Sequence, residues 1–274
     1  MKRSTLLRYV SLSLVGMLTV SACGLSRNPD SASSNNRPPE DNTPGVLTVG
    51  IEPAFPPFEF LAENGELQGF DVDLMKTVGE RMGVDVKFES LPFDGLIAAL
   101  QAESIDAAIS GMTNTEERSQ VVDFSRPYIE AGLAIAVQSS NTDIQGLQDL
   151  ERKKIGVKIG TTGAEQAAEI PGAEISTFQA IELALKELAN GSVDAVINDA
   201  PVTLDEIAKE NISGVKVVGD LITQEYYGIA VPKGSSNLEL INQALDEMMA
   251  DGTYAEIYQR WFGTAPPPLP EKAL

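Results

Sequence analysis

The segment SGMTNTEER, residues 110–118, holds the side chains whose types and spacing most clearly suggest chemistry. It follows a short apolar strand, and Thr115 is a good N-cap for the helix that the next residues begin. Because a helix N-terminus already carries positive potential, Arg118 is unfavourable there unless an anion is present. Together with Thr113, Arg118 could bind a carboxylate through its bidentate guanidinium. The alternative, which the residues alone slightly favour, is a surface ion pair with a neighbouring glutamate.

An internal similarity points to a second strand end. Residues 98–111 and 186–199 align without gaps, and each is typical of a helix, a tight turn and a buried strand. Such units also resemble one another by chance, but a duplication would give two α/β lobes with equivalent strand ends. Ligands bind in the crevice at such ends, which here are Ser110–Gly111 and Asn198–Asp199. The last carboxylate could face an ammonium group, or it could cap the helix that follows.

Two further segments and one aromatic ring supply candidate binding groups. Lys158 and Thr162 lie in KIGTTG, which follows a predicted strand and could present backbone N–H groups. A plain strand-to-helix turn is the alternative, since the spacing of a phosphate-binding loop is absent. Glu52 and Phe55 lie in a proline-stiffened loop after the first predicted strand, and Phe93 lies at a strand-to-helix junction. Core packing is the simpler role for Phe55.

The composition excludes several classes of function. The chain of 274 residues has a net charge of −20, which repels phosphate backbones and anionic lipid. We therefore expect no nucleic-acid binding, and membrane attachment only by covalent lipid or through a partner. The absence of histidine excludes histidine bases, Ser-His-Asp triads and histidine-ligated metals. We expect no cofactor and no metal.

Short β-rich runs alternate with amphipathic helical patterns from residue 46 onward, which predicts an α/β fold with largely parallel sheets. No predicted element is long and apolar enough to cross a membrane. The predicted strands are 46–51, 84–90, 104–110, 133–138, 154–159, 173–178, 192–198, 215–219 and 227–231. The predicted helices are 70–82, 93–102, 115–121, 162–169, 179–190, 201–210, 236–250 and 253–261.

The N-terminal segment is typical of a targeting signal. It has a basic start, an apolar stretch too short for an ordinary membrane span, and small residues directly before Cys23. This pattern predicts a lipoprotein signal peptide over residues 1–22 and lipidation of Cys23. An ordinary secretory signal with an incidental cysteine is the alternative. Residues 23–45 hold that cysteine and a polar stretch that predicts a disordered tether.

The order and spacing of several motifs resemble the bacterial extracellular solute-binding proteins, family 3, of polar amino-acid ABC transporters, most closely the glutamine-binding type. The resemblance covers about residues 46–263 and includes a signature helix that starts at GFDVDL, residues 69–74. The other matching motifs are AFPPFEF, ISGMTNTEER, VDFSRPY, KIGTTG, DAVINDAP, YGIAVPKGS and GTYAEIYQRWFG.

The resemblance implies a two-lobed, type II periplasmic-binding-protein-like fold of class α/β, with two mixed sheets flanked by helices and joined by a two-strand hinge. Ligand would favour the closed form, since contacts divided between two lobes are complete only on closure. The implied parts are lobe 1 (46–127 and 228–263), lobe 2 (133–222), hinge crossovers (128–132 and 223–227) and a C-terminal tail (264–274).

The resemblance also implies roles for the candidate residues at the strand ends. Arg118 would bind the α-carboxylate of an amino acid, assisted by Thr113 and by the backbone at Thr162. Asp199 would bind the α-ammonium group, helped by the backbone at Ser110–Gly111.

The ligand's aliphatic part would lie between Phe55 and Phe93, and its side chain would be selected by Glu52, Lys158 and Asn198. Because Glu52 and Lys158 roughly cancel in charge, a neutral amide would leave no buried charge unpaired, and glutamine fits best. The glutamine-binding pattern has an aspartate at the position of Glu52 and a histidine at that of Asn198. Asparagine, or a basic or acidic amino acid, therefore stays open.

The resemblance implies an extracytoplasmic binding protein, monomeric and lipid-anchored through Cys23, that delivers a polar L-amino acid to a membrane permease. One alternative is an amino-acid-sensing module without transport. Another is a periplasmic dehydratase-like enzyme on the same fold, whose acid or base would have to be Glu52 or Lys158. We expect a binding protein and no enzyme.

Overall fold

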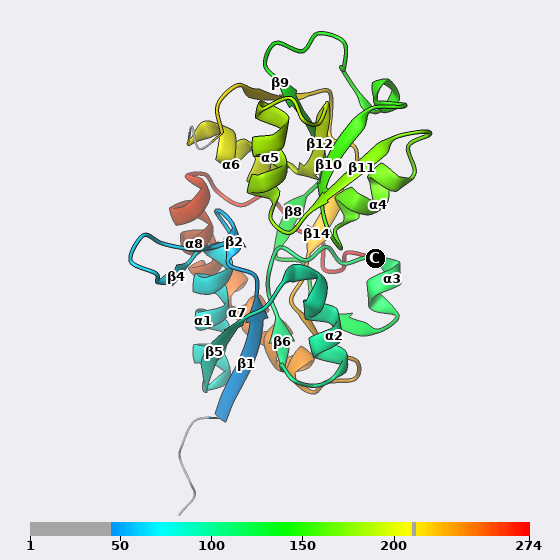
Figure 1. Cartoon of the computed structure of the whole chain (residues 1–274). Coiled ribbons are helices and arrows are strands. Elements are labelled where there is room, and N and C mark those ends of the chain that lie inside the picture. Colours follow the sequence, from blue (N-terminus) through cyan, green and yellow to red (C-terminus); the bar gives the residue numbers. More distant parts are fainter. Residues whose placement is uncertain (1–44, 210–211) are drawn as a thin grey trace, which may run out of the picture. The chain divides into compact units, whose positions relative to one another are not determined.

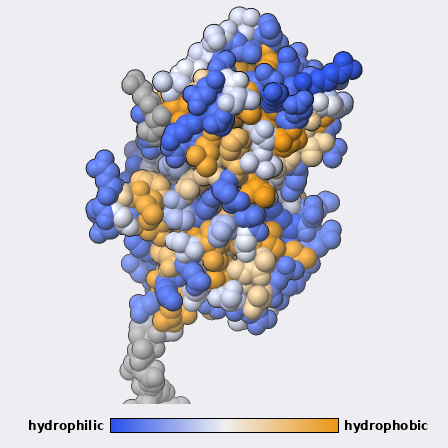
Figure 2. Space-filling model, viewed as in Figure 1, coloured by the Kyte–Doolittle hydropathy of each residue, from blue (hydrophilic) through white to orange (hydrophobic). Residues whose placement is uncertain are grey.

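The computed structural model describes residues 45–209 and 212–274 (Figure 1). The predicted signal peptide, the predicted lipidation site Cys23 and nearly all of the predicted tether lie outside these residues. Within the described part, two five-stranded sheets form, each flanked by helices. No helix among the described residues has the length and apolar character needed to cross a membrane. Figure 2 shows hydrophilic residues over much of one face, broken by small apolar patches.

The first sheet has the strand order β5-β1-β6-β15-β7. Strands β5 and β6 run parallel to β1, whereas β15 runs antiparallel to both of its neighbours. Helices α1, α7 and α8 pack together beside this sheet, and α2 lies on its other side (Figure 1). The bounds are β1 (Gly45–Ile51), β5 (Val84–Ser90), β6 (Ala107–Ala108), β7 (Val122–Phe124), β15 (Ala230–Pro232), α1 (Phe70–Met82), α2 (Leu96–Gln101), α3 (Glu116–Ser119), α7 (Asn237–Asp251) and α8 (Thr253–Phe262).

The second sheet repeats this pattern in the order β11-β10-β12-β9-β13. Strands β11 and β12 run parallel to β10, and β9 runs antiparallel to β12 and β13. Both sheets are therefore mixed, as the resemblance implied, and in each of them one strand runs against the other four. The bounds are β9 (Leu133–Gln138), β10 (Lys154–Lys158), β11 (Glu174–Phe178), β12 (Ala195–Asp199), β13 (Val215–Val218), α4 (Thr162–Ala168), α5 (Ile181–Ala189) and α6 (Ala200–Ala208).

The internal sequence similarity corresponds to equivalent positions in the two sheets. Asp106, just before β6, accepts a hydrogen bond from the backbone N–H of Thr48 (2.8 Å) and returns its own N–H to the Thr48 carbonyl (2.8 Å). Asp194, just before β12, forms the same pair of bonds with Lys154, each at 2.8 Å. Each aspartate thus ties the middle strand of its sheet to the strand at its side, and the two strand ends are equivalent.

Two short strands, β8 (Ile129–Ala131) and β14 (Glu225–Tyr227), pair antiparallel and form a separate ribbon between the two sheets (Figure 1). The next residues of the two strands stay in close contact. A Cβ atom on Gly132 would lie 2.3 Å from the Thr223 carbonyl oxygen, and Leu133 donates its N–H to the Thr223 hydroxyl (3.0 Å). The chain therefore passes twice between the sheets through one tight crossing.

Two predicted strands are shorter or divided. The strand predicted over 104–110 is reduced to β6, although the N–H groups of Asp106 and Ile109 still donate to β1 on either side of it. The strand predicted over 227–231 is split into β14 and β15, because Gly228 leaves the ribbon and donates to the Met112 carbonyl (3.1 Å). The helix predicted over 115–121 is the four-residue α3.

A small antiparallel sheet of β2 (Ala54–Phe55), β3 (Glu59–Leu61) and β4 (Leu67–Gln68) follows β1. The loop before α1 is fixed by backbone bonds, since Phe70 donates to the Pro57 carbonyl (3.0 Å) and Asp71 to the Phe58 carbonyl (2.9 Å). Gly69 makes this approach possible, because its φ is 140° and an added Cβ would lie 1.9 Å from the Phe58 oxygen.

Candidate functional site

The predicted binding residues lie at strand ends in both sheets. Glu52 follows β1, Ser110 lies two residues beyond β6, Lys158 ends β10 and Asp199 ends β12. These are carboxyl ends of strands, where α/β folds bind ligands. All but the half-buried Thr162 are buried, and the complete set is Glu52, Phe55, Phe93, Ser110, Gly111, Thr113, Arg118, Lys158, Thr162, Asn198 and Asp199.

Arg118 is buried, with 6% of its surface exposed, and its guanidinium joins segments from the two sheets. One nitrogen donates to the Thr113 carbonyl (2.9 Å) and another to the Gly160 carbonyl (3.0 Å). The guanidinium carbon lies 5.7 Å from the centre of the Phe93 ring. The prediction that Thr115 caps this helix is confirmed, since its hydroxyl accepts the Arg118 N–H (3.2 Å).

The surface ion pair that the sequence slightly favoured for Arg118 is wrong. Among the described residues, no carboxylate forms a salt bridge with it, and its side chain turns inward rather than towards its glutamate neighbours. Helix α3 has only four residues, so Arg118 stands in its last turn as well as its first, and the helix dipole offers little opposition. Burial lowers the pKa of Arg118, an effect partly offset by acids that include Asp199 and Glu225.

Lys158 and Glu52 form a buried ion pair between the two sheets. The Lys158 ammonium also lies 4.8 Å from the ring centres of both Phe55 and Phe93. Aromatic faces attract a desolvated cation, so the two rings and the carboxylate make a compact site for one positive charge. The ring of Phe55 in turn packs against Gly111, where an added Cβ would lie 2.6 Å from it.

Asp199 precedes α6 but does not cap it through its side chain. Its carboxylate instead accepts a hydrogen bond from the Tyr227 hydroxyl (2.6 Å). Burial raises the pKa of Asp199 to about 6. The neighbouring Asn198 amide donates to the Asp199 carbonyl (3.2 Å) and to the Thr203 hydroxyl (3.1 Å), so it is engaged within its own sheet and helix.

Four acidic or phenolic residues that contact the predicted binding residues were not themselves predicted to belong to the site. Glu225 on β14 accepts hydrogen bonds from the hydroxyls of Thr113 (2.7 Å) and Thr162 (3.0 Å). These two threonines lie on opposite sides of the predicted binding residues, which together form the cluster. Tyr227 holds Asp199, while Glu59 and Asp71 lie behind the end of β6. The one available signal was the alternation of Glu225 and Tyr227 in a segment expected to be a hinge, since these side chains share one face of a strand.

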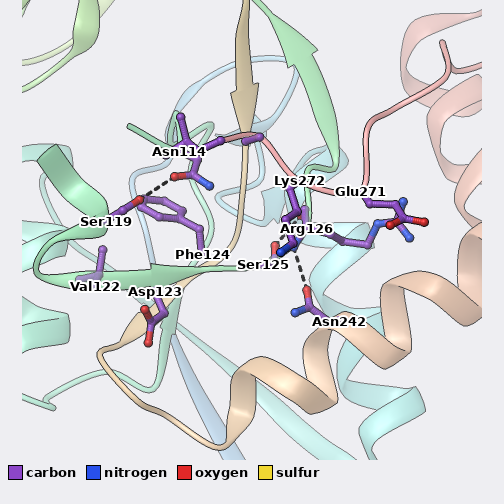
Figure 3. Close-up of a pocket in the computed structure, with 12 residues that line it drawn as sticks. Asn114, Ser119, Val122, Asp123, Phe124, Ser125, Arg126, Asn242, Glu271 and Lys272 are labelled. Atoms are coloured by element: carbon purple, nitrogen blue, oxygen red, sulfur yellow. Dashed lines mark hydrogen bonds between the residues drawn. The ribbon is translucent and has the colours of Figure 1, made fainter. Parts of the chain in front are cut away.

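One pocket lies at the predicted binding residues, and a second lies away from them. One of about 390 Å³ opens beside Arg118 and Phe93 and is also lined by Gly160 and Glu165. Another of about 360 Å³ lies elsewhere, between residues 122–126 and the C-terminal residues 271–274 (Figure 3). It contains none of the predicted binding residues. Among the described residues, no three acidic or cysteine side chains gather as metal ligands would.

Comparison with known proteins identifies the fold and the family. A solved structure of an ancestral arginine-binding protein bound to arginine is 48% identical, with a TM-score of 0.77 over 80% of this chain and 99% of that chain. An ancestral arginine-binding protein bound to glutamine is also 48% identical, with a TM-score of 0.74 and the same coverage. The L-cystine-binding protein TcyJ of Escherichia coli (strain K12) is 32% identical over 80% of this chain and 83% of its own length.

These likenesses confirm the predicted two-lobed, type II periplasmic-binding-protein-like fold. The family model for bacterial extracellular solute-binding proteins, family 3, matches residues 47–264, which is nearly all of the described part. The motifs that suggested this family, from GFDVDL to GTYAEIYQRWFG, all lie within the matched range. By its sequence and by its two linked mixed sheets, the chain belongs to the family 3 bacterial extracellular solute-binding proteins.

Proposed function

We propose that this protein binds a polar L-amino acid between its two lobes and delivers it to the permease of an ABC transporter. The observation that carries the proposal is the pairing pattern of two buried charges. Arg118 from the first lobe and Asp199 from the second bond to neutral groups, Arg118 to two carbonyls and Asp199 to a hydroxyl. A zwitterion would supply each with its missing counter-charge, the α-carboxylate to Arg118 and the α-ammonium to Asp199.

L-Glutamine is the ligand that fits the side-chain end of the cluster best. Glu52 and Lys158 already neutralise each other, so a cationic ligand would meet the Lys158 ammonium and an anionic one would meet Glu52. An amide can donate to one and accept from the other without adding a buried charge. The glutamine complex of the ancestral relative supports this choice, while the arginine complex makes L-arginine the second candidate.

A thermal-shift panel of the twenty amino acids tests the ligand. Binding to the folded state alone raises stability by about 2.7 kcal/mol at a concentration of 100 times Kd. We expect L-glutamine to give the largest rise in the unfolding midpoint. A larger rise with L-arginine would replace glutamine by arginine, and no rise with any amino acid would refute the proposed function.

The proposal includes the division into parts and the attachment to the membrane. Lobe 1 comprises 46–127 and 228–263, lobe 2 comprises 133–222, and the crossovers are 128–132 and 223–227. The family and the small residues directly before Cys23 support an extracytoplasmic, lipid-anchored protein with Cys23 as the lipidated residue. A Cys23→Ser variant should move from the membrane fraction to the soluble extracytoplasmic fraction. Equal membrane retention of the variant would contradict the anchor.

Binding without chemical conversion, and transport rather than sensing, complete the proposal. Unchanged ligand should be recovered after long incubation with the protein, whereas a dehydrated product would favour the enzyme alternative. Deletion of the gene should abolish uptake of the ligand by the cell. Uptake at the wild-type rate would favour a sensing module instead.

A further inference from the structure

Two carboxyl side chains lie directly behind the end of β6, with no exposure to solvent. Glu59 is the first residue of β3, and Asp71 is the second residue of α1. Both have 0% of their surface exposed. The backbone bonds that tie the start of α1 to residues 57 and 58 bring the carboxyl groups within hydrogen-bonding reach of each other. Two adjacent carboxylates without solvent repel each other strongly unless a proton lies between them.

The hydrogen bonds around the pair show where one proton is needed. Among the described residues, one oxygen of each carboxyl, Glu59 Oε2 and Asp71 Oδ1, has no donor. The remaining oxygens are satisfied. Glu59 Oε1 accepts from the Ser110 hydroxyl (2.8 Å), and Asp71 Oδ2 accepts from the Gly111 N–H (3.0 Å) and the Tyr128 hydroxyl (2.8 Å). A single proton between the two open oxygens would satisfy both.

The surroundings assign that proton to Glu59. Asp71 already accepts from two donors and stands in the first turn of the 13-residue α1, where negative charge is favoured. Within the part of the chain that the structure describes, Glu59 accepts from one hydroxyl only. We propose that Glu59 is protonated and donates to ionised Asp71, and that this pair positions Ser110 and Gly111 for binding the ligand ammonium.

The positioning acts through one peptide group and one hydroxyl. Gly111 directs its N–H at Asp71, and in a trans peptide the Ser110 carbonyl then points to the opposite side, away from the pair. The Ser110 hydroxyl donates to Glu59 and accepts the Glu52 N–H (3.1 Å), so it also fixes the backbone at Glu52. The Ser110 carbonyl is thereby held as an acceptor for an ammonium group.

The other titratable groups that face the pair do not supply the missing donor. Tyr128 uses its hydroxyl proton on the outer oxygen of Asp71. The charge of Lys158 lowers the pKa of Glu59 only in part, since burial and Asp71 raise it well above its usual range. Glu52 reaches the pair only through Ser110. Burial likewise raises the pKa of Asp71, to about 6, which leaves it ionised at neutral pH.

Infrared spectroscopy of the full-length chain without amino acid tests the proton directly. At about pH 7.5, acids with a pKa near 6 are almost fully ionised. Wild type should still show the C=O stretch of a protonated carboxylic acid, and Glu59→Gln should lack it. A wild-type spectrum without this band, or a band that persists in Glu59→Gln, would overturn the proposal. This result does not depend on any ligand.

Calorimetry with L-glutamine and with L-arginine then tests the positioning, which rests on the proposed function. Glu59→Gln keeps an N–H donor for Asp71 and a carbonyl acceptor for Ser110, so affinity should stay within about threefold of wild type. Glu59→Leu removes both and should weaken binding by about tenfold or more. A loss in Glu59→Gln as large as that in Glu59→Leu would refute the positioning role. If wild type binds neither amino acid, the proposed function fails, while the infrared result still decides the proton.

Discussion

Replacement of Arg118 by alanine is the most direct test of the binding mode. The side chain is 6% exposed and donates to two carbonyls, Thr113 at 2.9 Å and Gly160 at 3.0 Å, that belong to different lobes. In the proposed complex its guanidinium also pairs with the α-carboxylate. Arg118→Ala therefore leaves a buried anion on the ligand without a partner and removes one hydrogen bond between the lobes.

The expected loss follows from the burial of this charge. Removing one member of a buried ion pair costs about 3–5 kcal/mol, which weakens Kd by roughly 150- to 5,000-fold. The lost bond to Gly160 adds about 1 kcal/mol if it forms only on closure. Arg118→Lys should lie between wild type and alanine, because it keeps the charge but loses the bidentate fork.

Isothermal titration calorimetry with L-glutamine, or with the amino acid that the panel selects, measures these losses. Arg81→Ala is the matched control, since Arg81 forms a surface ion pair with Asp251 away from the cluster. The affinity of the Arg81→Ala variant for the ligand should equal that of wild type. Near-normal affinity in Arg118→Ala, with the fold verified by circular dichroism, would refute the assignment of Arg118 to the carboxylate.

Three further predictions concern stability without ligand. Because burial raises the pKa of Asp199 from 3.8 to about 6, the folded state binds a proton more tightly than the unfolded state, and stability should fall as pH rises from about 4 to about 6. In urea unfolding measured at several pH values, Asp199→Asn should show a smaller fall in the free energy of unfolding than wild type. If the stability of the two proteins changed with pH in parallel, this prediction would be contradicted. Glu52→Gln and Lys158→Met should each lower the free energy of unfolding by roughly 3 kcal/mol, and the double variant should lose less than the sum of the two. Additive losses would exclude coupling in the buried pair. Gly69→Ala should destabilise the fold far more than Gly65→Ala. An added Cβ at Gly69 lies 1.9 Å from a backbone oxygen, whereas one at Gly65 meets no atom within 4 Å. Gly65→Ala should therefore lower the free energy of unfolding by only about 1–2 kcal/mol. Similar thermal midpoints for the two would show that the loop before α1 adjusts.

Local patterns predicted most of the elements because each depends on residues close in sequence. Helix α1 over Phe70–Met82 ends at Gly83, whose left-handed φ of 71° the sequence position had suggested. The equivalence of the segments that end at Gly111 and Asp199 was also visible, because helix, turn and strand are read from adjacent residues.

The sequence could not show the partners of the buried polar groups. The residues around Arg118 slightly favoured a surface pair with a neighbouring glutamate, but its actual partners include Gly160, which is 42 residues away. Glu225 reaches Thr113 across 112 residues, and its alternation with Tyr227 does not identify that partner. For a similar reason, helix–strand alternation did not indicate which strand runs against the others. Strand β15 enters the first sheet from the far end of the chain, and its direction is set by tertiary pairing.

The place of β15 also affects how the chain acquires its fold during synthesis. All strands of the second sheet lie within residues 133–218, so that lobe is complete as soon as this stretch has emerged. The first sheet lacks the strand between β6 and β7 until residues 230–232 arrive. Meanwhile its edges can pair with other chains. A nascent chain arrested before residue 230 would thus carry one finished lobe and one sheet prone to aggregation.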